Sequence, residues 1–306
     1  MIILNEEAKK ILKSELEKRL EKEINIKEIT KVNNLKLTGV EIKGDSELAP
    51  VLYLENYYFC ENMEELIDKI ISDYNEIVNN SYDGIIISKN IINKNYILEN
   101  VNFILVNKEW NKENDELVSR DVDTTIENMK VFYCYEIYSD KEKRATLKVT
   151  KKMAETLNIS ENELYEAAVN NLKSNYNLTS FEGAVSGIIN KNIKEVIDEV
   201  SMLSSTFGML KMFILTNENY KNGAAQLLNS KLLNDISIEL NSDLLIIPSS
   251  IDEVIIMPYE EVLKMEDDMD ISALIEEVNN NCVQENLKLA NNPFIYKGTE
   301  KQISVM

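Results

Sequence analysis

Apolar residues recur at helical spacing in several stretches of the chain. Residues 5–23 place them three and four positions apart, which predicts an amphipathic helix capped by Asn5. Residues 63–78 repeat this pattern after Asn62, a second capping residue. Residues 194–203 are consistent with a helix or a strand, and their apolar spacing favours a helix.

Other stretches follow the two-residue alternation of strands. Residues 24–58 are rich in β-branched and aromatic side chains, and Asn33-Asn34 marks a turn between two of their strands. Gly39 interrupts the alternation of residues 35–43, so we expect a β-bulge there.

The middle of the chain combines both patterns. Residues 84–88 and 102–107 are short apolar runs, each consistent with a buried strand or a helical turn. Residues 130–138 predict a strand, and we expect residues 145–149 to pair with it. Two helices are expected next. Thr150 is predicted to cap a helix that ends at Leu157, and Ser160 and Glu163 are predicted to form a capping box for a helix over residues 161–173.

The most strongly patterned stretch is residues 210–258. It predicts a strand over 210–215, a helix over 224–240, and two strands over 244–247 and 253–257. The fold class expected from the whole chain is α+β, with mixed sheets, packed helices and two subdomains. We expect an N-terminal α+β domain over residues 1–140 and a C-terminal α+β domain with an acidic helical tail over 141–306.

Composition restricts the chemistry open to the protein. The chain has no histidine, which excludes Ser-His-Asp and Cys-His nucleophiles and HExxH zinc sites. Its three cysteines are far apart, and no glycine-rich phosphate loop is present. We therefore predict no enzyme, no catalytic residue, no cofactor and no metal site. No apolar run is long enough to span a bilayer and no signal peptide is apparent, so a soluble, cytoplasmic protein is expected.

The net charge of −20 points to the kind of partner. So acidic a chain is repelled by nucleic acid and by anionic membranes, and is attracted to a basic protein surface. The carboxylates concentrate in residues 251–281, where Lys264 is the only cation, and a helix is expected over 271–283. The residues predicted to bind a partner are Asp252, Glu253, Glu260, Glu261, Glu266, Asp267, Asp268 and Asp270.

Short motifs give the chain a resemblance to a bacterial protein family of unknown function. They are Thr216-Asn217, Asn222-Gly223-Ala224-Ala225 and the stretch Ile247 to Val254, which reads IPSSIDEV. The chain resembles this family over most of its length. It departs at position 252, where the family pattern has histidine and this chain has aspartate, and near Ser119-Arg120, where a Pro-His pair is replaced. Relatives resemble the cargo of mobile genetic elements, so the resemblance implies an anti-defence role.

These observations lead to one leading hypothesis and one alternative. The leading hypothesis is a non-enzymatic acidic protein-binding module that inhibits a basic nucleic-acid-binding protein. The alternative is a metal-dependent hydrolase or nuclease that uses clustered carboxylates such as Asp252 and Glu253. The turn from Ser249 to Glu253 also has a purely structural interpretation, in which its polar groups hydrogen-bond the turn itself. A homo-oligomer is a further possibility.

Overall fold

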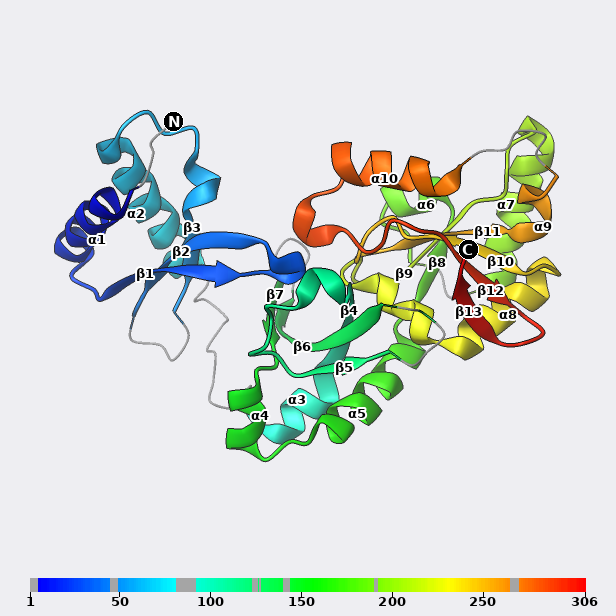
Figure 1. Ribbon diagram of the computed structural model, residues 1–306, viewed down its shortest axis with the longest axis horizontal. Coiled ribbons are helices and arrows are strands. Elements are labelled where there is room, and N and C mark those ends of the chain that lie inside the picture. Colours follow the sequence, from blue (N-terminus) through cyan, green and yellow to red (C-terminus); the bar gives the residue numbers. More distant parts are fainter. Residues whose placement is uncertain are drawn as a thin grey trace. The chain divides into compact units, whose positions relative to one another are not determined.

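The structure is a computed structural model, and it describes residues 5–44, 49–80, 92–122, 126, 128–139, 144–189, 192–264 and 270–306. The chain forms two compact units, residues 1–93 and residues 94–306 (Figure 1). The boundary expected at residue 140 instead falls between two strands of the second unit that pair with each other. The apolar run 84–88 lies outside the described residues.

The described part of unit 1 contains a three-stranded antiparallel sheet, in the order β1-β2-β3, and two α-helices packed on it (Figure 1). The apolar stripe of the first predicted helix supplies Leu12 and Leu16 to the core, where both are fully buried. Arg19 joins the two helices through ion pairs with Glu64 at 2.7 Å and Asp68 at 2.8 Å. The elements are α1 (Glu6–Leu20), β1 (Ile24–Thr30), η1 (Val32–Asn34), β2 (Lys36–Ile42), β3 (Val51–Tyr53), η2 (Leu54–Tyr57) and α2 (Met63–Asn80).

The turn between β1 and β2 forms where Asn33-Asn34 predicts it. Both residues adopt left-handed backbone angles, with φ of 60° and 54°, which asparagine tolerates better than most residues. The bulge expected at Gly39 is wrong, because β1 and β2 pair without a break in register. A Cβ at Gly39 would lie 2.8 Å from Val51 Cγ1 and would also collide with the Ile29 side chain. Glycine is therefore required at position 39 because a larger residue would clash with Ile29 and Val51.

Unit 2 begins with a four-stranded sheet in which β6 pairs with β4, β5 and β7. β6 is buried over Val131–Tyr135, and α5 packs against β4. The expected pairing of residues 145–149 with this strand is confirmed, as are the Thr150 cap and the Ser160/Glu163 capping box. The elements are α3 (Lys94–Asn100), β4 (Val101–Asn107), η3 (Glu109–Asn111), β5 (Ser119–Asp121), β6 (Met129–Ser139), β7 (Arg144–Lys148), α4 (Lys151–Leu157) and α5 (Glu161–Ser174).

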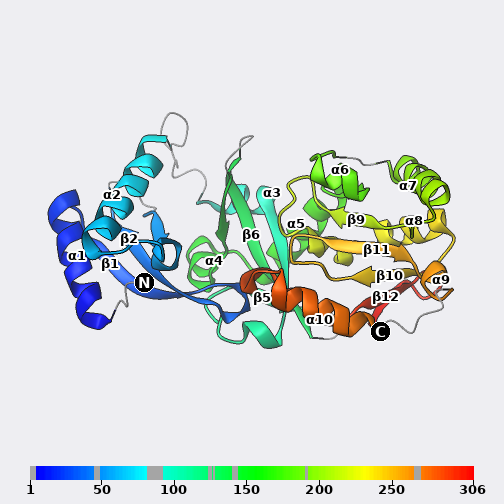
Figure 2. The same cartoon turned by 90° about the horizontal axis from the view of Figure 1, so that it is seen from above.

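The second sheet of unit 2 has six strands in the order β13-β12-β10-β11-β9-β8. Helices α6, α7 and α8 lie along it (Figure 2). The elements are β8 (Asn177–Thr179), α6 (Phe181–Val185), α7 (Ile193–Phe207), β9 (Phe213–Thr216), η4 (Gly223–Leu228), α8 (Ser230–Leu240), β10 (Leu244–Ile247), β11 (Val254–Pro258), α9 (Tyr259–Val262), α10 (Ile271–Asn281), η5 (Glu285–Leu287), β12 (Phe294–Lys297) and β13 (Gln302–Val305).

The prediction of a single helix over residues 224–240 is wrong in one respect, because the structure has two helices there, η4 and α8. The break falls at Asn229, whose side chain accepts a hydrogen bond from the N–H of Leu232 at 3.3 Å and so caps α8. A capping residue inside an apolar pattern starts a new helix there because its side chain competes with the backbone for the N–H groups.

The α+β fold class is confirmed, but the expected mixture of parallel and antiparallel strands is not. Every pairing among the described strands is antiparallel. The long connection from β9 to β10 would suit a parallel pair. β11 inserts between these two strands, however, and pairs with each of them in the antiparallel sense.

Candidate functional site

The family-like motifs of residues 216–253 meet at one end of β9 and β11. β9 ends at Thr216, and Asn217 folds the next residues into a turn: its Oδ1 accepts the N–H groups of Asn219 at 3.0 Å and Lys221 at 3.2 Å. The turn holds Tyr220 and Asn222 at positive φ, 52° and 57°. Such angles are uncommon for residues other than glycine, so the surrounding hydrogen bonds have to stabilise them.

Asp252 is the centre of this arrangement, which we call the Asp252 hub and define as Thr216, Lys221, Asn222, Gly223, Ser250 and Asp252. Its Oδ1 accepts the Asn222 N–H at 2.8 Å, and its Oδ2 pairs with Lys221 Nζ at 2.8 Å. Its backbone oxygen accepts the Thr216 hydroxyl at 2.7 Å and the Gly223 N–H at 3.0 Å. Its own N–H donates to Ser250 Oγ at 3.0 Å. These hydrogen bonds link the end of β9 to the turn that precedes β11.

This geometry changes the role expected for Asp252. Only 16% of its side chain is exposed, and both carboxylate oxygens have partners inside the unit. Its contacts stabilise the turn within unit 2, and the predicted role of Asp252 in binding a partner protein stays a prediction. The structural interpretation of the turn accounts for all of these contacts.

Glu253 differs from its neighbour. Its carboxylate is half-buried, and its nearest donor is the Ser249 hydroxyl at 3.5 Å. Burial raises the pKa of Glu253, and the adjacent charge of Asp252 raises it further. The ionised form of Glu253 is therefore less favourable in the folded chain than in water. Among the residues that the structure describes, no group of three or more His, Cys, Asp or Glu side chains is arranged to hold a metal ion.

Of the remaining residues predicted for the acidic surface, those that the structure describes lie on different elements. Glu261 pairs with Lys211 at 2.5 Å, so its charge is used within the unit. Glu260 is exposed on α9, and Asp270 caps α10 by accepting the Ala273 N–H at 3.0 Å. Figures 1 and 2 both place α9 and α10 apart within unit 2. Glu266, Asp267 and Asp268 lie outside the described residues.

Helix α10 carries exposed groups that the sequence predictions did not single out. Only Ile275 and Asn279 are buried in its eleven residues. Leu274 is 46% exposed and Val278 is 43% exposed, and Glu276 and Glu277 are exposed beside them. The apolar spacing of residues 271–278 was a signal for the helix, but it gave no indication that part of the apolar stripe would face solvent.

A second polar cluster lies at the first sheet of unit 2. Arg120 pairs with Glu161 Oε2 at 2.5 Å and lies over the Tyr165 ring, 4.0 Å from its centroid. The buried Tyr133 hydroxyl donates to Glu161 Oε1, and burial followed by this hydrogen bond raises the pKa of Tyr133. Both oxygens of Glu161 are thereby satisfied, which makes the cluster a link between β5, β6 and α5. No spacing in the sequence reveals it, because its members come from distant elements.

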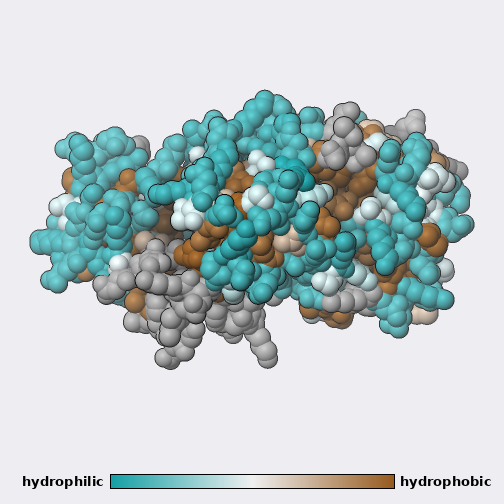
Figure 3. Space-filling model, turned by 90° about the horizontal axis from the view of Figure 1, so that it is seen from below, coloured by the Kyte–Doolittle hydropathy of each residue, from teal (hydrophilic) through white to brown (hydrophobic). Residues whose placement is uncertain are grey.

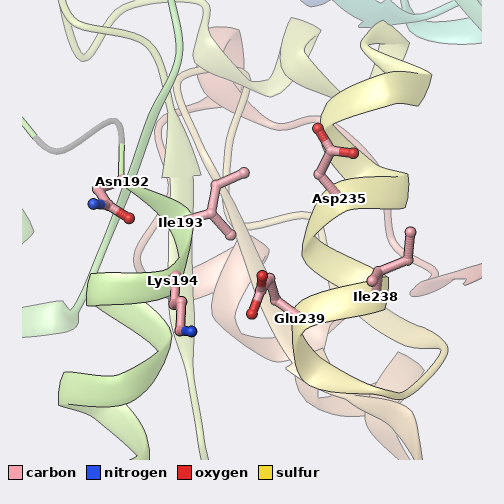
Figure 4. A pocket seen from close by; sticks show the side chains of 6 residues that line it. All are labelled: Asn192, Ile193, Lys194, Asp235, Ile238 and Glu239. Carbon is pink, nitrogen blue, oxygen red and sulfur yellow. The ribbon is translucent and has the colours of Figure 1, made fainter.

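A groove lies between the start of α7 and α8 (Figure 4). Its volume is about 640 Å³, and its lining residues are Asn192, Ile193, Lys194, Asp235, Ile238 and Glu239. Figure 3 shows that the exposed face of unit 2 in this view also contains hydrophobic residues among the hydrophilic ones. The sequence predictions did not include this groove, since its two walls are about 40 positions apart in the chain.

The model of DUF5688, described as a family of unknown function, matches residues 5–298. No curated protein and no solved structure matches the chain. None of the described helices combines the length and the apolar character needed to cross a membrane.

Proposed function

The chain belongs to the DUF5688 family, and we propose that it acts in the cytoplasm as a non-enzymatic acidic protein-binding module that docks through α10 on a basic protein. In this proposal the bound partner is a nucleic-acid-binding protein, and docking inhibits it. The observation that carries the proposal is the exposed apolar and acidic face of α10.

The anchoring of α10 supports this role. Asn279 donates from Nδ2 to the Ala290 oxygen and to Asn291 Oδ1, each at 2.9 Å, and Ile275 is buried beside it. These two side chains fix the helix from one side. The opposite side is exposed and combines apolar with acidic side chains, a combination that suits a protein contact.

Helical spacing gathers the docking residues. Leu274, Glu277, Val278 and Asn281 are three or four positions apart and share one side of α10. Leu274 and Val278 supply a small apolar contact, and Glu277 supplies a charge next to it. Interfaces commonly pair an apolar centre with charged residues at the rim, and the rim charges govern association rate and partner choice.

The charge of unit 2 also supports a basic partner. Residues 94–306 hold 35 acidic against 21 basic side chains, so they carry −14 of the net charge of −20. Such a field accelerates the approach of a cationic protein and weakens with added salt. It also competes with the phosphates that a nucleic-acid-binding protein recognises. The contacts of Asp252 also favour binding over metal-dependent hydrolysis, since its carboxylate is already held by the Asn222 N–H and by Lys221, and a metal ion would have to compete with that cation.

The test is affinity capture with three forms of the chain from a lysate of the source organism. The first is the wild type, the second is Glu276→Lys/Glu277→Lys in α10, and the third is a matched charge reversal, Glu155→Lys/Glu166→Lys, on exposed positions of α4 and α5. We expect a basic protein to be captured by the wild type and the matched control, and to be lost with the α10 variant.

The captured protein is then purified and examined directly. Its affinity for the wild type should fall as salt rises from 50 to 300 mM, and the wild type should displace a labelled oligonucleotide from it. An identical set of captured proteins for all three forms would exclude α10 as the docking element. Capture without displacement of the oligonucleotide would retain binding but refute inhibition by competition.

A further inference from the structure

Helix α6 turns an apolar side toward solvent. Its inner side is fixed on β8 by Gly183, where an added Cβ would collide with Thr179 Oγ1, and by Ser180, whose Oγ accepts the Gly183 N–H at 3.1 Å. The outer side consists of Phe181, 62% exposed, and Val185, 77% exposed. A helix packed this way would normally present polar residues outward.

The segment after α6 continues this apolar side and is held in place by its backbone. The Ile188 N–H donates to the Gly183 oxygen at 2.9 Å. The Ile188 oxygen accepts the Tyr220 hydroxyl at 2.6 Å and Asn177 Nδ2 at 3.1 Å. The side chains of Ile188 and Ile189 are nevertheless more than half exposed. A surface fixed in this way loses little conformational entropy when it binds a partner.

The groove between α7 and α8 lies next along the chain. Ile189 is three residues before Asn192, so their Cα atoms are at most about 11 Å apart. In Figure 4, Ile193 and the carboxylates of Asp235 and Glu239 point into the space between the two helices. Ile238, at 66% exposure, is also among the lining residues, and in Figure 4 its side chain leaves α8 on the other side from Glu239.

This short span lets one bound segment contact both the apolar side of α6 and the groove, and we call the two together the α6–α8 surface. Its apolar members are Phe181, Val185, Ile188, Ile189, Ile193 and Ile238. Its carboxylates are the exposed Glu182 and Glu239 and the partly buried Asp235, with Lys194 as the cation of the groove. Apolar residues bordered by carboxylates are complementary to a segment that carries apolar and cationic side chains together.

We propose that the α6–α8 surface docks a cationic amphipathic helix of a partner protein. Apolar side chains at helical spacing would contact α6 and the Ile193–Ile238 walls, and a Lys or Arg would reach Asp235 and Glu239. This inference shares one premise with the proposed function, namely that the partner protein is positively charged. It uses no residue of α10, so the two proposals fail or succeed separately.

The test uses a fluorescein-labelled 18-residue peptide of leucine and lysine with leucine at helical spacing, and a matched peptide with glutamate in place of lysine. Binding to the full chain is followed by fluorescence anisotropy. We expect the lysine peptide to bind and the glutamate peptide not to bind. Phe181→Ser/Val185→Ser should weaken binding of the lysine peptide about tenfold, as expected for loss of central apolar contacts.

Two further variants separate site-specific binding from general attraction to an acidic protein. Asp235→Asn/Glu239→Gln should weaken binding and flatten its salt dependence, and it remains decisive if the α6 variant fails to fold. Leu274→Ser/Val278→Ser in α10 should leave the affinity unchanged. The proposal is overturned if both peptides bind equally, if the charge-neutral groove variant binds like the wild type, or if the α10 variant alone removes binding.

Discussion

Replacing Gly223 with alanine tests the Asp252 hub directly. The added Cβ would lie 2.6 Å from the Asp252 backbone oxygen and 2.7 Å from the Asn217 nitrogen, and would also meet Thr216 Oγ1. Two of these three atoms belong to the backbone and cannot rotate away. The backbone around Gly223 or Asp252 therefore has to move.

The magnitude follows from the contacts that such a movement disturbs. Three hydrogen bonds lie within reach: Gly223 N to Asp252 O at 3.0 Å, Thr216 Oγ1 to Asp252 O at 2.7 Å, and Ala224 N to Ile251 O at 3.2 Å. At about 1 kcal/mol each, their loss amounts to about 3 kcal/mol. Overpacking adds roughly 1–3 kcal/mol, so we expect the free energy of unfolding to fall by about 4–6 kcal/mol.

The assay is thermal unfolding followed by circular dichroism and calorimetry. For a unit of this size each kcal/mol lowers Tm by roughly 2–4 °C, so the expected decrease exceeds about 8 °C. Gly44→Ala is the matched control, because among the described residues its Cβ would meet only Tyr74 Oη, at 3.6 Å. Without a clash, such a change stabilises by about 0.4–1 kcal/mol through the unfolded chain. If Gly223→Ala also raises Tm, the close packing at the hub is refuted.

Three further predictions concern buried polar groups. The pKa of Glu253 is raised in the folded chain, so its ionised form opposes folding at neutral pH. Glu253→Gln should therefore raise Tm at pH 7–8 and lose this effect below about pH 4, where the glutamate is protonated. A difference in Tm that stays constant across that pH range would contradict the assignment. The Tyr296 hydroxyl is buried without a hydrogen-bond partner among the described residues, so Tyr296→Phe should leave Tm unchanged or raise it, and a loss above about 1 kcal/mol in denaturant titration would reveal a partner. Cys282 is exposed, whereas Cys60 and Cys134 are buried, and burial raises the pKa of Cys134 to about 12. A thiol reagent at pH 8 should therefore label Cys282 alone in the folded chain and all three cysteines after denaturation.

The sequence was sufficient for features that depend on neighbouring residues. The helix caps at Asn5, Asn62 and Thr150, and the capping box at Ser160, are all formed, because each needs only a side chain and an N–H two or three positions away. The strands over residues 244–247 and 254–258 follow equally from a local run of apolar residues.

Features that depend on distant residues were not predictable in this way. Gly39 looked like a bulge, and its actual role depends on Ile29 and Val51 from the flanking strands. Asp252 looked like part of an acidic surface, because the sequence does not reveal that Asn222 and Lys221 approach it across the sheet end. The groove between α7 and α8 likewise exists only through tertiary packing. Charge density along a sequence therefore overstates the charge that a surface presents.

The pairing of Asp252 with Lys221 has an evolutionary consequence. The carboxylate needs the cation beside it, and the Lys221 side chain is otherwise largely exposed, at 64%. A family member that lacks a carboxylate at position 252 has no use for lysine at position 221, whereas the glycine at 223 is required by the backbone whatever residue 252 is. Positions 221 and 252 should therefore change together among relatives, while position 223 stays fixed.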